Sequence, residues 1–301
     1  MEIIHAESYQ DLLPDVDNLW LKSKVQAEKL IECGFWEGIA YKDLIHWMGN
    51  FKTPEEKLLC ALLLDRFNFK SSAQLKALIG HSLISCMPAC FIKETSTILS
   101  QKLFETSLLG RKVSSDIRLV PVIRDSDPPT KSGPAVARLF KRLGGVNEKN
   151  MIWPWQLDEA ISSGVNKIVF IDDTLATGDQ FVGFLDRFFC GEVNKVCFGY
   201  IPLVAHVDGI SNLNQKYPFI SVEPVELADS SSSFFNQKNI PDLKDLYDSV
   251  AGRIFSSSFY KESRYGYGKL SLTVGFEHST PNATLPLYWY SSESFRPLVR
   301  R

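Results

Sequence analysis

The sequence has few of the features that mark specialised classes of protein. Its 301 residues contain no run of about 18 apolar residues, so no transmembrane helix is expected. The first ten residues lack a basic stretch followed by an apolar core, so no secretory signal peptide is expected. The net charge is only −2, and no broadly basic surface indicates nucleic-acid binding. We therefore expect a cytoplasmic protein with no membrane partner.

Close cysteine pairs are also missing. None of the six cysteines forms a Cys-x-x-Cys pair, and the closest spacing is Cys86 to Cys90, with His81 as the nearest further ligand. A zinc site needs more ligands than this, so buried reduced thiols are the better interpretation. Apolar residues at 45% and charged residues at 23% are ordinary for a globular chain and exclude a largely disordered one.

The first part of the chain, residues 1–115, is predicted to be a helical region. Its clearest start signal is Thr53-Pro54-Glu55-Glu56, which combines an N-cap residue, a first-turn proline and early acids. Leucines follow at helical spacing over residues 55–64, and further helices are expected at 72–79 and 94–109. No motif in this region indicates chemistry.

The pattern changes near residue 116, where short apolar runs begin to alternate with helical segments. Strands are expected at 117–123, 167–171, 195–204 and 219–225, and helices at 134–143, 155–163, 179–189, 207–214 and 243–255. Alternation at this spacing predicts βαβ units and a parallel sheet. The predicted fold class is α/β, with a parallel-sheet domain over residues 116–301 following the N-terminal helical region.

The strongest signal is the segment 168–180, which reads IVFIDDTLATGDQ. Four apolar residues bring a strand to its carboxyl end, and Asp172 and Asp173 follow at once. Ligands of open α/β sheets bind outside the carboxyl ends of the strands. Carboxylates at that edge suit sugar hydroxyls or, less directly, a hydrated Mg²⁺.

The turn after the two acids is suited to a phosphate. It leads into a helix N-terminus, which offers free backbone N–H groups and a partial positive charge. Thr174 and Thr177 add hydroxyl donors, and Gly178 lets the backbone approach closely. Phosphate, sugar diol and metal together describe a ribose-5-phosphate ligand.

This segment resembles the phosphoribosyl-pyrophosphate (PRPP) loop of the type I phosphoribosyltransferases, in which two acids precede a short Thr- and Gly-containing loop. The resemblance implies a phosphoribosyltransferase-like core in which Asp172 and Asp173 contact the ribose 2- and 3-hydroxyls. It implies Mg²⁺ held through the ligand and water, with one of the two acids as its protein contact. Gln180 departs from the family, which usually has Thr or Ser there. The residues expected to wrap the 5-phosphate are Thr174, Leu175, Ala176, Thr177 and Gly178.

The motif also has other interpretations. The two acids and Thr174 would serve a purely structural role if they only capped the helix that begins near Asp179. A haloacid-dehalogenase phosphatase needs acids at the first and third positions after the strand, and the third is Thr174. A phospho-receiver domain is equally poor, because the motif leads into a glycine turn and no partner signature follows.

A second candidate site is the polar loop 124–133. In the resembled family, a loop after an earlier strand and basic residues hold pyrophosphate. Lys131 and Ser132 precede a helix start that suits an anion, and Arg124 suits bidentate pairing with a phosphate. The alternative is a solvated surface loop. Lys131 and Ser132 do not form a Walker A motif, because the glycine-rich segment that precedes the lysine in that motif is missing.

The third candidate lies near the C-terminus, where residues 265–268 and 275–289 are dense in aromatics, glycine and amides. Such a mix suits base stacking and hydrogen bonding. The region resembles that of the phosphoribosyltransferase-like proteins of bacterial conflict or anti-phage systems, including some retron operons. This resemblance implies that His278 and Asn282 face the active cleft, against the alternative of His278 as a structural loop histidine.

These observations favour an enzyme that acts on PRPP or a nucleotide with Mg²⁺. The subgroup resemblance adds a toxin or effector role in an anti-phage system. Two alternatives stay open: a catalytically inactive PRPP- or nucleotide-binding regulatory module, and an assembly subunit. The partners of such an assembly would be a reverse transcriptase and its RNA or DNA product, and the near-neutral charge favours contact through protein.

Overall fold

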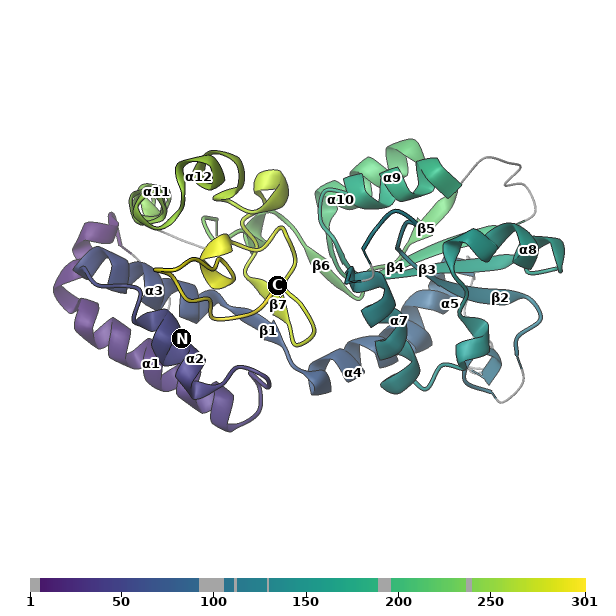
Figure 1. Cartoon of the computed structure of the whole chain (residues 1–301), viewed down its shortest axis with the longest axis horizontal. Helices are drawn as coiled ribbons and strands as arrows, with labels where there is room; N and C mark the ends of the chain where they lie inside the picture. The colour runs from purple at the N-terminus through teal and green to yellow at the C-terminus, as the bar shows by residue number, and fades with distance from the viewer. Residues whose placement is uncertain (1–5, 92–105, 111–112, 129, 189–195, 237–239) are drawn as a thin grey trace. The chain divides into compact units, whose positions relative to one another are not determined.

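The computed structural model describes residues 6–91, 106–110, 113–128, 130–188, 196–236 and 240–301. The chain forms two compact units. The central unit is Ala73–Asp229, and the terminal unit combines Met1–Ser72 with Ser230–Arg301. Figure 1 labels the elements of both units along the chain.

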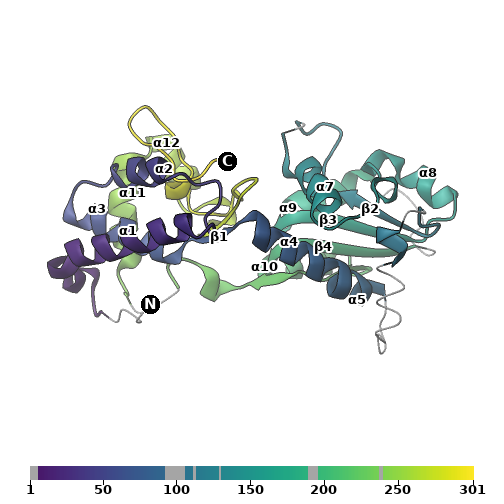
Figure 2. The same ribbon diagram turned by 90° about the horizontal axis from the view of Figure 1, so that it is seen from below.

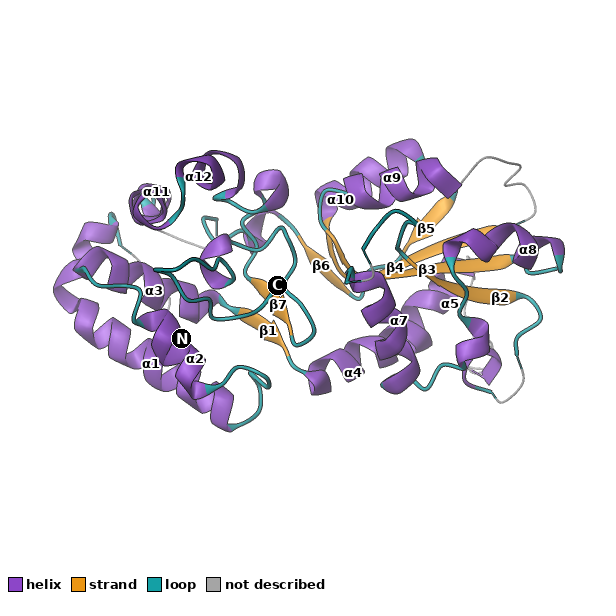
Figure 3. Ribbon diagram, in the orientation of Figure 1, coloured by secondary structure: helices purple, strands orange, loops and turns teal. Residues whose placement is uncertain are grey.

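A parallel sheet organises the central unit (Figure 3). The strands follow the order β2-β3-β4-β5, and β6 pairs with a later part of β4. This arrangement confirms the predicted α/β fold class with a parallel sheet. The strands are β2 (Ile117–Pro121), β3 (Lys167–Leu175), β4 (Cys197–His206), β5 (Ile220–Val222) and β6 (Glu226–Ala228).

Helices cover both faces of this sheet, with α9 and α10 on one face and α4 and α5 on the other (Figures 1 and 2). The helices of the central unit are α4 (Ser72–His81), α5 (Met87–Phe91), α7 (Ser132–Arg142), α8 (Leu157–Ser162), α9 (Asp179–Phe188) and α10 (Val207–Lys216). Short helical turns are η2 (Ser82–Cys86), η3 (Glu148–Asn150) and η4 (Pro154–Gln156).

The continuous apolar run of β3 explains its place in the middle of the sheet. Residues 168–171 are fully buried, as expected for a parallel strand that is covered on both faces. The Phe170 ring packs edge-on against Phe181 and Phe184 of α9, at 5.3 and 5.5 Å between centroids. This aromatic contact fixes α9 over the strand that carries the acid pair.

The strand that carries the acid pair is longer than predicted, and its neighbour ends two residues later than predicted. β3 continues through both acids to Leu175, and β4 continues to His206, because Thr174 pairs with Val204 and Leu175 with Ala205. Of the strand predicted over 219–225, only β5 at Ile220–Val222 forms, and β6 begins directly after the predicted range at Glu226. The helix predicted over 94–109 lies largely outside the described residues.

The terminal unit is mainly helical and contains a small parallel pair of strands. Thr53 caps α3 through a capping box with Glu56, as the sequence predicts. The two strands are β1 (Asn68–Lys70) and β7 (Val274–Phe276). The helices are α1 (Val16–Glu32), α2 (Tyr41–Met48), α3 (Pro54–Arg66), α11 (Leu243–Ile254) and α12 (Ser257–Ser263), with turns η1 (Tyr9–Asp15), η5 (Ser230–Ser232), η6 (Tyr267–Lys269) and η7 (Pro286–Tyr288).

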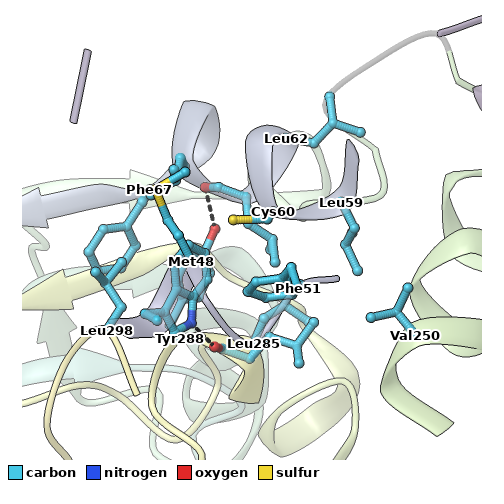
Figure 4. Packing of buried hydrophobic residues seen from close by; sticks show 14 of the residues in the cluster. Met48, Phe51, Leu59, Cys60, Leu62, Phe67, Val250, Leu285, Tyr288 and Leu298 are labelled. Atoms are coloured by element: carbon cyan, nitrogen blue, oxygen red, sulfur yellow. Dashed lines mark hydrogen bonds between the residues drawn. The ribbon is translucent and has the colours of Figure 1, made fainter. Parts of the chain in front are cut away.

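Segments from both ends of the chain share the core of the terminal unit (Figure 4). The Trp47 indole N–H donates to the Leu287 carbonyl at 2.7 Å, and the Tyr288 hydroxyl donates to the Leu63 carbonyl at 2.8 Å. The Phe67 and Tyr288 rings stack at 4.5 Å. Because the two ends of the chain pack together, the boundaries between the compact units lie near residues 72 and 229, whereas the sequence predicted one division at residue 116.

Across the described residues, no helix is both long enough and apolar enough to span a bilayer.

Candidate functional site

The two acids of the motif lie within the sheet. The last residue of β2, Pro121, pairs with Ile171, directly before Asp172 and Asp173 on β3. The acids are only 3% and 7% exposed. They are therefore held by a rigid, buried strand, rather than by a loop beyond its end as the sequence suggested.

Hydrogen bonds hold the Asp172 carboxyl group in place. The backbone N–H of Asp173 donates to Asp172 Oδ1 at 2.9 Å, and the Tyr200 hydroxyl donates to Oδ2 at 3.4 Å. Tyr200 is itself fixed by stacking on Phe181, with 3.8 Å between ring centroids. Burial, followed by repulsion from Asp173, raises the pKa of Asp172 well above its ordinary value. The neutral form of Asp172, which can both donate and accept a hydrogen bond, is therefore favoured relative to that of an exposed carboxyl group.

Thr174 adds an unsatisfied hydroxyl beside the acids. Its Oγ1 is buried and has no hydrogen-bond partner among the described residues. Buried polar groups are nearly always paired in native proteins, and each exception calls for an explanation. A ligand oxygen would supply the missing partner, so this atom marks the surface that a ligand would contact.

The loop that follows turns sharply into α9. Gly178 has φ of +88°, a left-handed conformation that favours glycine. The Thr177 hydroxyl donates to Asp179 Oδ2 at 2.7 Å. Asp179 is the first residue of α9, where a carboxylate is favoured by the helix dipole. The sequence assigns the Thr177 hydroxyl to a phosphate, but in this structure the hydroxyl donates to Asp179 instead.

Helix α10 packs against this loop through Gly209 and Asn212, which the sequence did not predict as site residues. A Cβ on Gly209 would lie 2.2 Å from the Ala176 carbonyl oxygen, so only glycine allows this approach. The Asn212 amide donates to the Thr177 carbonyl at 2.9 Å and to Asp179 Oδ1 at 3.4 Å. A glycine inside the helix predicted over 207–214 was the one signal of this contact. No signal marked Asn212.

The second predicted site, the loop 124–133, follows the neighbouring strand β2. The Arg124 guanidinium donates to both carboxylate oxygens of Asp127, at 2.8 Å for the shorter contact, and this pairing raises the pKa of Arg124. Asp125 pairs with Arg187 of α9 at 2.5 Å. In this structure the Arg124 guanidinium therefore binds a carboxylate of its own loop, whereas the sequence assigned it to a phosphate.

Lys131 and Ser132 lie at the start of α7. Lys131 is the N-cap residue and Ser132 the first helical residue, and both are half-buried. A Cβ on the next residue, Gly133, would lie 2.7 Å from the Val122 carbonyl oxygen. This close approach seats the N-terminus of α7 against the carboxyl end of β2, where a helix start suits an anion.

His278 and Asn282 belong to the terminal unit, whereas the acids and the loop 124–133 belong to the central unit. His278 is half-buried beside the Phe276 ring, at 5.3 Å between centroids. Asn282 is exposed and lines a pocket within the terminal unit.

The thiols and acids form no metal cluster in the described part of the chain. No group of three or more His, Cys, Asp or Glu there could hold a metal ion. Burial raises the pKa of Cys86 to about 11 and that of Cys90 to about 12. Both are free thiols that stay protonated near neutral pH.

Comparison with known proteins identifies a family. The model of the family described as PRTase-CE matches residues 44–301 of this chain. No curated protein matches it. Among solved structures, the chain is similar to the AQ2163 protein from Aquifex aeolicus, with 13% identity over 62% of this chain and 83% of that one. The TM-score is 0.30, too low to support a conclusion about the fold.

Proposed function

The chain belongs to the PRTase-CE family, a phosphoribosyltransferase-like family, and on that premise we propose that it acts on PRPP or a nucleotide together with Mg²⁺. The observation that carries the proposal is the buried acid pair beside the unpaired Thr174 hydroxyl. Burying two adjacent carboxyl groups costs stability, which favours a ligand as their purpose.

In the proposed reaction, the bond between the ribose anomeric carbon and its leaving oxygen breaks. The electron pair leaves with pyrophosphate, positive charge develops on the sugar ring, and a base nitrogen then attacks the same carbon. Asp172 and Asp173 would hold the ribose hydroxyls, and Thr174 Oγ1 would pair with a ligand oxygen. These groups would act by fixing the sugar and stabilising developing charge. The N–H groups at the start of α9 would face the 5-phosphate.

The residues present fit Mg²⁺ only as an ion carried by the ligand. The described residues offer no cluster of metal ligands, and the raised pKa of Asp172 weakens that carboxyl group as a metal ligand. We therefore place Mg²⁺ on the pyrophosphate oxygens, where it would offset their charge, with Asp173 reaching it through water.

The test is a calorimetric titration with PRPP and Mg²⁺, combined with an assay for released pyrophosphate. Asp172→Asn/Asp173→Asn should weaken binding about 10- to 100-fold, the equivalent of roughly 1.4–2.8 kcal/mol. A matched control is Asp158→Asn/Glu159→Gln, which neutralises two adjacent exposed acids on α8 of the same unit. Equal affinity of the two double variants would contradict the site.

A second candidate function is a regulatory module that binds PRPP or a nucleotide without turnover. The specific observation in its favour is Asp179, whose carboxylate accepts hydrogen bonds from Thr177 and Asn212 at the proposed phosphate position. Gln180 adds a further departure from the active family. Binding without pyrophosphate release would favour this function. Asp179→Asn removes the competing charge and should then tighten phosphate binding several-fold.

The finer role is also a proposal: an effector or toxin of an anti-phage system, acting with a reverse transcriptase and its RNA or DNA product. Its support is the resemblance of the C-terminal region, including His278 and Asn282, to proteins of such systems. Expression of the wild-type chain with its partners should arrest growth, and Asp172→Asn/Asp173→Asn should relieve the arrest. Equal arrest by both chains would contradict an effector that acts through this site.

A further inference from the structure

The terminal unit contains a pocket that the acid pair does not explain. It has a volume of about 400 Å³, within the range of small-molecule sites, and it lies beside α12 and the loop 266–269. We propose that this pocket is a second binding site, for a nucleoside monophosphate. The inference concerns the terminal unit alone and does not depend on the function proposed for the central unit.

One wall of the pocket is aromatic and fixed in place. The Trp289 indole N–H donates to the Thr284 carbonyl at 3.0 Å, which holds the ring. The Arg301 guanidinium lies over this ring, 4.5 Å from its centroid. Tyr267, which is 51% exposed, adds a second aromatic surface. Planar aromatic and guanidinium groups are the surfaces on which nucleobases stack.

The polar groups of the pocket match the rest of a nucleotide. Lys269 and Arg301 supply two cations, and Glu262 supplies the single acid of the lining. This balance suits one phosphate group better than a polyphosphate. The exposed Asn282 side chain offers both a donor and an acceptor, as the edge of a base requires.

The loop that forms the pocket has an unusual backbone. Lys269 and Ser271 are the non-glycine residues with positive φ in the described chain, at +57° and +53°. Gly266 is pressed against the neighbouring segment, since a Cβ there would lie 2.7 Å from the Ala283 carbonyl oxygen.

Hydrogen bonds hold this strained conformation. The Tyr267 N–H donates to the Asn282 carbonyl at 2.8 Å, and the Leu272 N–H donates to the Ala283 carbonyl at 3.0 Å. Strained residues of this kind cluster at ligand sites, because the fold must over-determine them to keep them. One of the two residues with positive φ, Lys269, is thus also one of the two cations that the pocket offers a phosphate.

The experiment is a calorimetric titration of the full chain with AMP, GMP, CMP and UMP. At least one should bind, and Lys269→Glu, Tyr267→Leu and Asn282→Ala should each weaken that binding at least tenfold. Two matched controls should leave it unchanged. Lys261→Glu reverses an exposed charge on α12 outside the pocket, and Tyr41→Leu removes a tyrosine that is also 51% exposed.

The outcomes separate this site from the central one. Binding that survives all three pocket variants, or that Asp172→Asn/Asp173→Asn abolishes, would overturn the proposal. Absence of binding at millimolar nucleotide would also overturn it, as would binding of a single-stranded oligonucleotide but of no mononucleotide. Because the pocket side chains that are changed lie at the surface, a far-ultraviolet circular dichroism spectrum like that of the wild type is expected for each variant.

Discussion

The buried polar groups around the acid pair of the central unit differ from those in the core of the terminal unit. In the terminal unit, the buried hydrogen-bonding atoms of Trp47, Tyr288 and Thr284 each donate to a backbone carbonyl, at 2.7, 2.8 and 2.5 Å. Beside the acid pair, the Tyr200 hydroxyl donates to Asp172 over a long 3.4 Å, and the Thr174 hydroxyl has no hydrogen-bond partner among the described residues. Polar groups in the terminal core stabilise the fold, whereas those around the acid pair remain available to a ligand at a cost in stability.

The largest effect is expected from Trp47→Ala in the terminal core. Trp47 is fully buried, and its loss leaves a cavity and an unpaired carbonyl at Leu287. The free energy of unfolding should fall by about 3–5 kcal/mol, measured by urea denaturation. Trp155→Ala removes a tryptophan that is 53% exposed and should change it by less than about 1 kcal/mol. Similar losses in the two variants would contradict this account of the core.

A smaller effect is expected where α10 supports the loop of the central unit. The new methyl group of Gly209→Ala would lie 2.2 Å from the Ala176 carbonyl oxygen, so the loop must move. The expected loss of stability is about 1–3 kcal/mol, and PRPP binding should weaken as well.

The matched control for this prediction is Gly183→Ala on α9, where a Cβ meets nothing within 4 Å. It should stabilise the helix by about 0.5–1 kcal/mol and leave binding unchanged. Unchanged binding in Gly209→Ala would show that the loop does not need its support from α10.

The smallest of these effects concerns pH. Burial and Asp173 raise the pKa of Asp172, so its contribution to stability is full below the ordinary pKa of about 3.9 and is lost as pH rises toward the raised value. Asp172→Asn removes this loss. The variant should unfold a few degrees above the wild type at pH 8, at about 2–4 °C per kcal/mol, with a smaller difference at pH 4. An equal difference at both pH values would contradict a raised pKa of Asp172 in the folded protein.

The sequence predicted the central unit well, because its strands carry strong local signals. The apolar run 168–171 and the two acids after it were enough to locate the acid pair. The continuation of β3 to Leu175 was not predictable, since two adjacent aspartates are unusual in a strand. Pairing of Thr174 with Val204 overrides that local preference.

The terminal unit was not predictable in the same way. Its core depends on contacts such as Tyr288 with Leu63, which are separated by most of the chain. No local pattern announces such a contact, and β1 is too short to stand out from its helical surroundings. The contact of Asn212 with the loop 174–178 was not predicted either, because an amide side chain in a helix is compatible with many roles.

The central claim is that the polar groups beside the acid pair serve a ligand rather than the fold. The most direct measurement compares thermal unfolding of Thr174→Val and Thr284→Val, with and without PRPP and Mg²⁺. Thr284→Val should lower the unfolding temperature, because it removes a made hydrogen bond, and it should keep the rise produced by ligand. Thr174→Val should unfold at or above the wild-type temperature without ligand and lose most of that rise. A Thr174→Val protein that is destabilised like Thr284→Val, yet is still stabilised fully by ligand, would contradict the account.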